Sequence, residues 1–241
     1  MTIQQLMTND VSKLMTKLAS YQMLPQLKRE MIIDEAISSI TCTAEEAAIA
    51  TDRFYAQHQL NNETAIATWC QRYEMTAEQL ESLAIRQFKI SKFQESNWEN
   101  RIGSYFLKRK KQLDRVSYSL IRTKNAGLAQ ELYFRILEGE QSFAELAKEY
   151  SEGSEAHTHG LLGPVALGNI HPRIGVQLAI SQLGQLSAPI KIKEWLVIVR
   201  LEKVMPAQLN DEMRDRLLNE LFENWLFEQI NSLRQPTAIA A

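Results

Sequence analysis

Over residues 1 to 110, apolar positions recur with the period of an α-helix, and residues that interrupt helices are nearly absent. Pro25 and Gly103 are the only proline and glycine in this stretch. Strands and hairpins normally need more turn residues than this. The pattern therefore predicts an all-helical segment, within which Leu27 and Met31 lie on the apolar face of a helix that begins near Leu24.

Capping residues mark several helix boundaries in this stretch. The capping-box spacing, in which the side chains of two residues three apart satisfy each other's backbone amides, occurs twice. The two pairs are Thr43 with Glu46 and Thr76 with Gln79. Asn61 or Asn62 can cap a helix between them, and a further helix is predicted from about Trp98 to Leu113.

From Arg115 onward the pattern alternates between strand-like and helix-like segments. A third capping box, Ser142 with Glu145, begins a short helix whose apolar positions include Phe143 and Leu146. The other predicted helices span 125–137 and 171–180, and the predicted strands span 116–121, 161–167, 186–192 and 195–204. The last of these strands is apolar on both faces, as a central strand is expected to be.

The segment from Asn210 to Leu233 carries a broad apolar stripe that includes Phe222 and Trp225. Such a stripe is too apolar to remain in water, so the helix needs a packing partner, and we predict the N-terminal helices. The expected fold class is α+β, with an N-terminal all-helical module completed by a C-terminal helix, together with a domain of four strands and flanking helices. The predicted domains are residues 1–112, 113–206 and 207–241.

Composition narrows the possible partners and surroundings. The net charge of -2 argues against nucleic acid as a partner, because phosphate binding requires an excess of cationic side chains. No apolar run is long enough to span a membrane, and the first twenty residues lack the continuous apolar core of a signal peptide. Cys42 and Cys70 lack metal or redox spacing and are expected to be reduced thiols, so a cytoplasmic location is expected.

The stretch from Ser142 to Pro164 carries a family resemblance. Phe143, Leu146, Ala147, Tyr150 and Ser151 are followed by a polar loop and by the sequence HGLLG from His159 to Gly163. This order resembles the parvulin (PpiC or rotamase) family of peptidyl-prolyl cis/trans isomerases, and the resemblance extends over roughly Val116 to Val204. It implies a four-stranded antiparallel sheet in which the strands and helices follow the order predicted above.

The layout of the whole chain is similar to that of SurA-type folding factors. In those proteins, helices before the isomerase domain and a helix after it form one peptide-binding module. SurA-type proteins are exported, whereas no export signal is expected here. The similarity implies that unfolded or extended polypeptide is the partner.

The resemblance also shows which positions of the family's catalytic site have changed. Parvulins carry two hydrogen-bonded histidines and a Cys or Asp that faces the imide. The first-strand histidine falls on Tyr118, the last-strand histidine falls on Leu196 and the Cys or Asp position falls on Gly153. The polar catalytic groups are therefore expected to be degenerate, although the hydroxyl of Tyr118 can still form hydrogen bonds.

The family's apolar peptide-binding pocket is better preserved. Its leucine, methionine and phenylalanine positions correspond to Leu162, Ile170 and Ile174. These residues either bind an apolar side chain of a peptide or are ordinary core residues, and the sequence leaves both interpretations open.

No cofactor is expected. His157, His159 and His171 lie near the same site, but they have no accompanying Cys or carboxylate cluster, so we interpret the first two as part of a solvated loop rather than as metal ligands. The sequence thus favours a peptide-binding folding factor or chaperone with a degenerate isomerase site. Two alternatives stay open, namely an active prolyl isomerase that uses a rearranged site around Tyr118, and a module dedicated to one partner, such as a precursor peptide.

Overall fold

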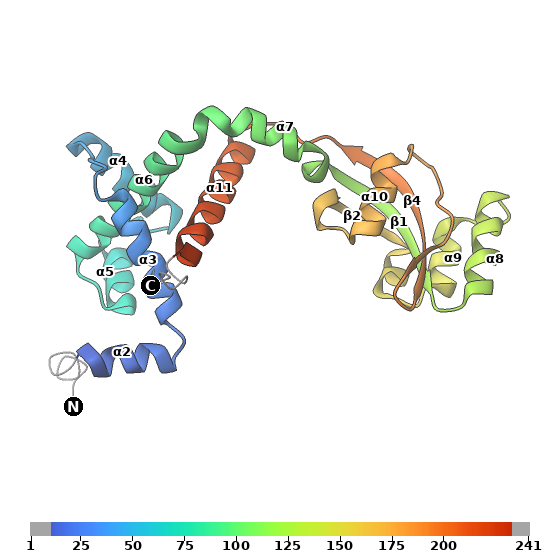
Figure 1. The fold of residues 1–241 in the computed structure, drawn as a ribbon, viewed down its shortest axis with the longest axis horizontal. Coiled ribbons are helices and arrows are strands. Elements are labelled where there is room, and N and C mark those ends of the chain that lie inside the picture. The colour runs from blue at the N-terminus through green and yellow to red at the C-terminus, as the bar shows by residue number, and fades with distance from the viewer. Residues whose placement is uncertain (1–10, 233–241) are drawn as a thin grey trace, which may run out of the picture. The chain divides into compact units, whose positions relative to one another are not determined.

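The computed structural model describes residues 11–232, which divide into two compact units. One unit comprises residues 11–102 together with 214–232, and the other comprises residues 103–213. The first is helical, and the second contains the sheet (Figure 1). The α+β class and the four-stranded antiparallel sheet with flanking helices are confirmed. The predicted domain boundaries, after residues 112 and 206, stay predictions.

The helical unit is built from helices whose starts are largely those that the capping residues predict. Its helices are α2 (Val11–Ser20), α3 (Leu24–Ile37), α4 (Ala44–Gln57), α5 (Glu63–Tyr73), α6 (Ala77–Trp98) and α11 (Asp211–Ser232), with the 3-10 turn η1 (Glu99–Arg101) after α6. Both predicted capping boxes are present at the starts of α4 and α6, and Asn62 caps α5. Leu233, the last residue of the predicted C-terminal helix, lies outside the described residues.

Two expectations for these helices were wrong. In α3 the buried side chains are Ile33 and Ile37, whereas Leu27 and Met31 are exposed. The apolar positions of α3 therefore do not form one clean stripe, and contact with neighbouring helices decides which side is buried. The helix predicted to begin near Trp98 begins at Ile102 instead, because α6 continues through Trp98 and a 3-10 turn separates the two helices.

Helix α11 packs against helices that come much earlier in the chain. The rings of Phe222 and Trp225 lie 6.2 and 5.1 Å, between centroids, from the ring of Phe93 on α6. At the edge of this cluster, both terminal nitrogens of Arg29 on α3 donate to Glu223, each at 2.8 Å. The apolar stripe of the C-terminal helix thus finds its partner in α6, and ion pairs fix its position.

The second unit is a sheet with the strand order β2-β1-β4-β3, in which every neighbouring pair is antiparallel. The strands are β1 (Arg115–Thr123), β2 (Leu161–Ala166), β3 (Ile190–Ile192) and β4 (Trp195–Met205). The helices are α7 (Ile102–Leu113), α8 (Ala126–Leu137), α9 (Phe143–Tyr150) and α10 (Pro172–Ile180), and 3-10 turns η2 (Ser154–Thr158) and η3 (Leu167–Asn169) flank β2. The strand predicted over 186–192 is shorter than expected, since only Leu186 forms an isolated bridge, with Arg200, before β3 begins.

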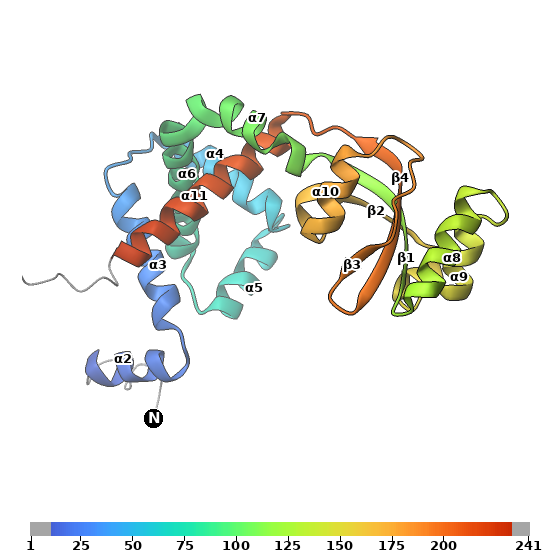
Figure 2. The same ribbon diagram turned by 45° about the vertical axis from the view of Figure 1, so that its right-hand side comes forward.

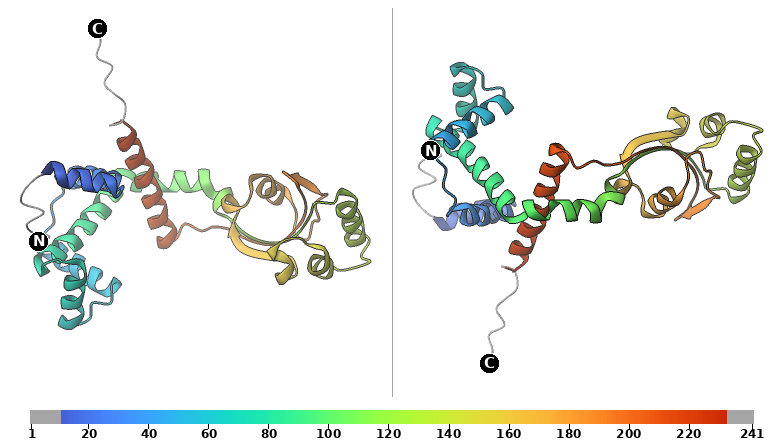
Figure 3. Two further views of the ribbon diagram at one scale, coloured as in Figure 1. Left: turned by 90° about the horizontal axis from the view of Figure 1, so that it is seen from below. Right: turned by 90° about the horizontal axis from the view of Figure 1, so that it is seen from above.

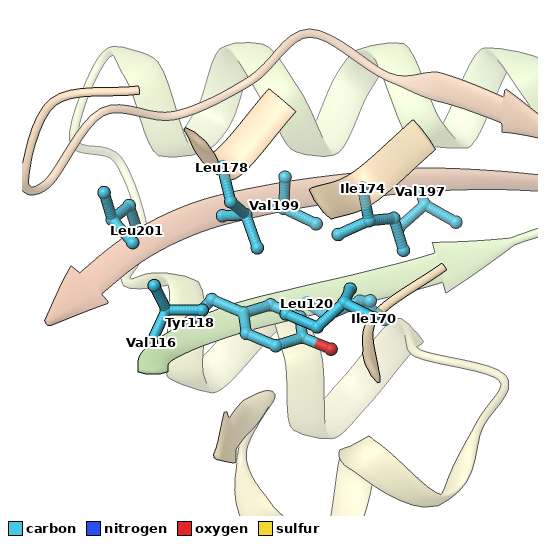
Figure 4. Close-up of a cluster of buried hydrophobic side chains, with 9 residues drawn as sticks. All are labelled: Val116, Tyr118, Leu120, Ile170, Ile174, Leu178, Val197, Val199 and Leu201. Atoms are coloured by element: carbon cyan, nitrogen blue, oxygen red, sulfur yellow. The ribbon is translucent and has the colours of Figure 1, made fainter. Parts of the chain in front are cut away.

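The two faces of this sheet are covered by different helices (Figures 2 and 3). On one face, Phe143 and Leu146 of α9 and Leu132 of α8 pack against Ile121 and Ile198. On the other face, Ile174 and Leu178 of α10 pack against side chains of β1 and β4 (Figure 4). Because side chains alternate along a strand, each position of β1 and β4 is committed to one of these two cores.

The first prediction concerns the contribution of the aromatic contact between α6 and α11 to the free energy of unfolding. Phe222 is 3% exposed and Phe227, on the same helix, is 66% exposed. Phe222→Ala should lower the free energy of unfolding by about 3–5 kcal/mol, because a buried ring leaves a cavity when it is removed. Phe227→Ala, the matched control, should change it by less than about 0.5 kcal/mol. Urea unfolding followed by circular dichroism measures both, and equal losses would contradict this packing.

Candidate functional site

An open pocket of about 360 Å³ lies on the α10 face of the sheet. Its apolar walls come from β1, β2, β3, β4 and α10, and they are formed by Leu120, Leu162, Ile174, Ile192, Trp195 and Val197. Its polar lining consists of Tyr118 and Arg122 on β1, Ser154 and Glu155 on η2, and His171. The pocket therefore combines a largely apolar interior with an arginine and a glutamate at one side.

The alternation of β1 decides which residues reach the pocket. Tyr118, Leu120 and Arg122 lie two apart and share one face, and their partners on β4 are Leu201, Val199 and Val197. The first positions of this face are deeply buried, whereas Arg122 lies nearer the open end, beside the half-buried Trp195. Along this face of β1 the side chains therefore change from buried and apolar to the cationic Arg122 at the open end of the pocket.

Arg122 and Glu155 form an ion pair at the side of the pocket. Glu155 is only 4% exposed, and its Oε1 atom lies 3.0 Å from Nε of Arg122. The same oxygen accepts a hydrogen bond of 2.5 Å from the hydroxyl of Ser151. A carboxylate this deeply buried requires such partners, because an unpaired charge is costly to remove from water.

Gly153 leaves room for this guanidinium. A Cβ atom at residue 153 would overlap Nε, Nη2 and Cζ of Arg122. The φ angle of Gly153 is -122°, which any residue can adopt, so the lack of space and not the backbone conformation excludes a side chain here. Arg122 therefore occupies the volume in which a side chain at position 153 would lie.

The loop that carries Gly153 and Glu155 is fastened to the end of β1. The carboxylate of Glu152 accepts hydrogen bonds from the Thr123 hydroxyl at 2.5 Å and from the Lys124 amide at 2.9 Å. These bonds hold the pKa of Glu152 below its usual range, since they favour the charged form. The Ser151 hydroxyl also accepts from the Arg122 amide at 3.1 Å. The position of Glu155 relative to Arg122 is thus set by several bonds.

Tyr118 keeps its proton in this environment. Its side chain is buried, and burial, followed by the nearby charge of Glu155, raises the pKa of its phenol above the usual value of 10.0. At neutral pH the phenol is therefore a neutral hydroxyl that can both donate and accept hydrogen bonds. It is placed to serve as a polar group of the pocket and not as an anion.

The structure brings most of the predicted site residues together. Tyr118, Leu162 and Ile174 line the pocket, and Ile170 belongs to the hydrophobic cluster behind it. Gly153 borders Arg122. Leu196, in contrast, pairs with Thr123 and shares the opposite face of β4 with Ile198, so it lies outside the pocket.

The residues of β4 that line the pocket are Trp195 and Val197, the two neighbours of Leu196 in the sequence. Neither Leu196 nor Val197 offers a hydrogen-bonding side chain. Of the three histidines considered as ligands, only His171 lines the pocket. Within residues 11–232, no group of three or more His, Cys, Asp and Glu side chains is arranged to hold a metal ion.

Sequence reasoning missed Arg122, Glu155 and Trp195. The first was detectable, because the alternation of β1 places Arg122 on the face of Tyr118. Trp195 was placed correctly in the last strand, but its face was not assigned. Glu155 could not be identified, since a glutamate in a polar loop is normally solvated and only the fold shows that this one is buried.

The second prediction concerns how strongly Gly153 and Arg122 are coupled in stability. Gly153→Ala should destabilise the sheet-containing unit by about 1–2 kcal/mol, because the guanidinium must move and leave Glu155 without its cation. In an Arg122→Met background the same change should cost less than about 0.5 kcal/mol, since the obstructing group is gone.

Thermal or urea unfolding of the two single variants and the double variant measures this coupling. Gly103→Ala is a matched control, because a Cβ atom there meets nothing within 4 Å and should show no coupling to Arg122. Equal costs of Gly153→Ala in both backgrounds would show that the guanidinium does not occupy this space.

Comparison with known proteins places this geometry in a family. Residues 119–203 match the family model described as Rotamase, the PPIC-type PPIASE domain. A comparison with curated protein sequences found no match. Among the described residues, no helix is both long enough and apolar enough to cross a membrane.

Solved structures show a similar fold. The peptidylprolyl isomerase PrsA of Bacillus anthracis is 18% identical with a TM-score of 0.51, over 86% of this chain and 97% of that chain. PrsA of Bacillus cereus is 19% identical with a TM-score of 0.52, over 95% of this chain and 89% of that chain. The parvulin domain of PpiD from Escherichia coli is 31% identical, over 42% of this chain and 97% of that chain, with a TM-score of 0.36.

At such low identity, the likeness to the two PrsA structures concerns the fold alone. The likeness extends over most of the chain. It therefore includes the layout expected from SurA-type folding factors, in which helices precede and follow the sheet-containing domain along the sequence. The residues matched by the family model include the pocket lining from Leu120 to Val197, and Tyr118 lies just before the first matched residue. The chain therefore carries, over residues 119–203, a PPIC-type rotamase domain of the parvulin family.

Proposed function

We propose that this protein is a peptide-binding folding factor, whose parvulin-type pocket binds prolyl or aliphatic side chains of extended polypeptide with little catalysis of isomerisation. The observation that supports the proposal is the largely apolar lining of the pocket. The family resemblance implies that its polar groups differ from those of active parvulins. A volume of about 360 Å³ exceeds what a single prolyl side chain fills, so neighbouring peptide groups fit as well.

The apolar walls supply the driving force for binding. Leu162, Ile174 and Trp195 line the pocket together, and removal of apolar surface from water contributes about 25 cal/mol per Å². Binding of this kind needs no catalytic group. It accepts proline, and it also accepts other side chains of similar size and polarity.

Efficient isomerisation needs more than apolar walls. The barrier to rotation about an X-Pro bond is roughly 20 kcal/mol, and a catalyst lowers it only by binding the twisted imide better than the planar one. The family resemblance places two hydrogen-bonded histidines and a Cys or Asp around that imide. Here Tyr118 is the one hydrogen-bonding group at those three positions, since the others are Gly153 and Leu196.

A second candidate is an active isomerase with a rearranged site. It is favoured by the Arg122 guanidinium, which fills the space beside Gly153, and by the hydroxyl of Tyr118 on the same face of β1. Together they offer a cationic donor and a neutral hydroxyl. Under this alternative, the two groups would stabilise the twisted imide.

The client and the cellular location remain proposals. PrsA of Bacillus anthracis is described as a peptidylprolyl isomerase, and by analogy we propose unfolded or extended polypeptide as the partner of this chain. A dedicated partner, such as a precursor peptide, would use the same pocket. The expected cytoplasmic location stays a prediction.

The third prediction separates the two candidates. A series of X-Pro tetrapeptides, each with a different residue before proline, should isomerise in the presence of the chain at the uncatalysed rate. The reason is that neither Gly153 nor Leu196 can act on the imide. A protease-coupled or NMR exchange assay measures the rates, with a known parvulin as positive control. A clear catalytic constant for any peptide would establish the alternative.

The fourth prediction concerns clients without proline. The chain should slow the aggregation of a proline-free client, as followed by light scattering, because apolar binding does not require an imide. Leu162→Lys, which puts a charge into the pocket wall, should weaken the effect, whereas Lys203→Met on an exposed position of β4 should not. If only proline-containing clients respond, the folding-factor proposal fails.

A further inference from the structure

The guanidinium of Arg122 reaches the pocket with most of its donors unused. An arginine side chain presents five N–H groups in a planar fork. Here Nε lies beside Glu155, at 3.0 Å, and among the described residues no group accepts a hydrogen bond from Nη1 or Nη2. The outer edge of the fork is therefore available to an acceptor that enters the pocket.

The fork is held in place before any ligand arrives. Its inner side pairs with the buried Glu155, and its Cζ atom lies 5.4 Å from the centre of the Trp195 ring. The Nζ atom of Lys124 lies 4.7 Å from the centre of the same ring. A donor fixed in this way loses little conformational entropy on binding, and the second cation makes the rim more attractive to oxygen atoms that carry negative charge.

The guanidinium of Arg122 lies where the family resemblance places another polar side chain. The family resemblance places a Cys or Asp that faces the bound imide at position 153, and in this chain Arg122 fills the space beside that position. A polar group has thus been retained at the same side of the pocket, although it comes from β1 instead of the loop. It is a cationic donor, whereas the group that it replaces is a thiol or carboxyl.

We propose that Arg122 is the ligand-binding donor of the pocket and holds an acceptor oxygen of the bound peptide through Nη1 and Nη2. The proposal rests on the proposed function, because it assumes that the pocket binds peptide. The oxygen belongs either to the main-chain carbonyl before the buried side chain or to an acidic side chain at that position. Both sources offer oxygen lone pairs, and a carboxylate can accept from both arms of the fork.

The experiment compares four fluorescent peptides that share one prolyl residue. In the first pair, the residue before proline is alanine with either its normal carbonyl or a thiocarbonyl, which is a weaker acceptor. In the second pair, that residue is glutamate or the isosteric glutamine. Fluorescence anisotropy with the full chain measures the four dissociation constants.

The same constants are measured for Arg122→Met, Arg122→Lys and the matched control Arg115→Met. Arg115 lies at the opposite end of β1, exposed to solvent. For the wild type and the control, in one of the two pairs the peptide with the weaker acceptor should bind roughly tenfold less tightly than the other peptide of that pair. This is the effect expected for a hydrogen bond to a charged donor. In Arg122→Met that difference should disappear, and in Arg122→Lys, which keeps the charge without the fork, it should shrink.

The ligand pairs keep the test valid even if a variant unfolds, because they are also compared on the wild type alone. A difference confined to the thiocarbonyl pair assigns the main-chain carbonyl, and one confined to the glutamate pair assigns the acidic side chain. Binding that ignores both changes, or differences that persist in Arg122→Met, would overturn the proposal. Failure of every peptide to bind the wild type would instead overturn the proposed function.

Discussion

The ion pair between Arg122 and Glu155 joins the two segments that enclose the pocket, a sheet strand and the loop after α9. Glu155 is buried, and its carboxylate lies beside the guanidinium of Arg122 and accepts a hydrogen bond from the hydroxyl of Ser151. The guanidinium in turn requires that residue 153 have no side chain. One interaction therefore links the shape of the pocket, the chemistry of its rim and the need for glycine at position 153. A substitution at any of these positions affects the others.

The remaining structure supports this arrangement through two separate cores. Alternation along β1 commits Ile121 to the core under α8 and α9, and it commits Leu120 and Arg122 to the face that carries α10. The loop that bears Glu155 is tied back to the end of β1 by Glu152. The helical unit is stabilised independently, by the aromatic contacts of α6 with α11 and by the ion pair of Arg29 with Glu223. The pocket is therefore built entirely within the parvulin-type unit.

The elements were more predictable from the sequence than the site. Capping residues such as Thr43 and Ser142 act through local hydrogen bonds, so the helix starts that they mark are confirmed. The parvulin resemblance is confirmed as well, by the family model that matches residues 119–203. It could be recognised from the sequence because its motif residues, such as Phe143 and Leu146, lie in one short stretch. The prediction of which side of α3 is buried was wrong, because that side is determined by helices distant in sequence. The role of Arg122 was missed for the same reason, since an arginine on a strand becomes a pocket residue only when the loop carrying Glu155 folds over it.

We propose that the pocket around Tyr118, Leu162 and Trp195 binds extended peptide. The most direct test of this proposal is a titration of the isotopically labelled full chain with an unlabelled prolyl peptide, in which the indole N–H signal of Trp195 is followed by NMR. If peptide binds in this pocket, the indole signal should shift and saturate, together with the amides of β1 and of the Glu152 to Glu155 loop. Shifts confined to the helical unit, with the indole of Trp195 unchanged at saturation, would contradict the proposal.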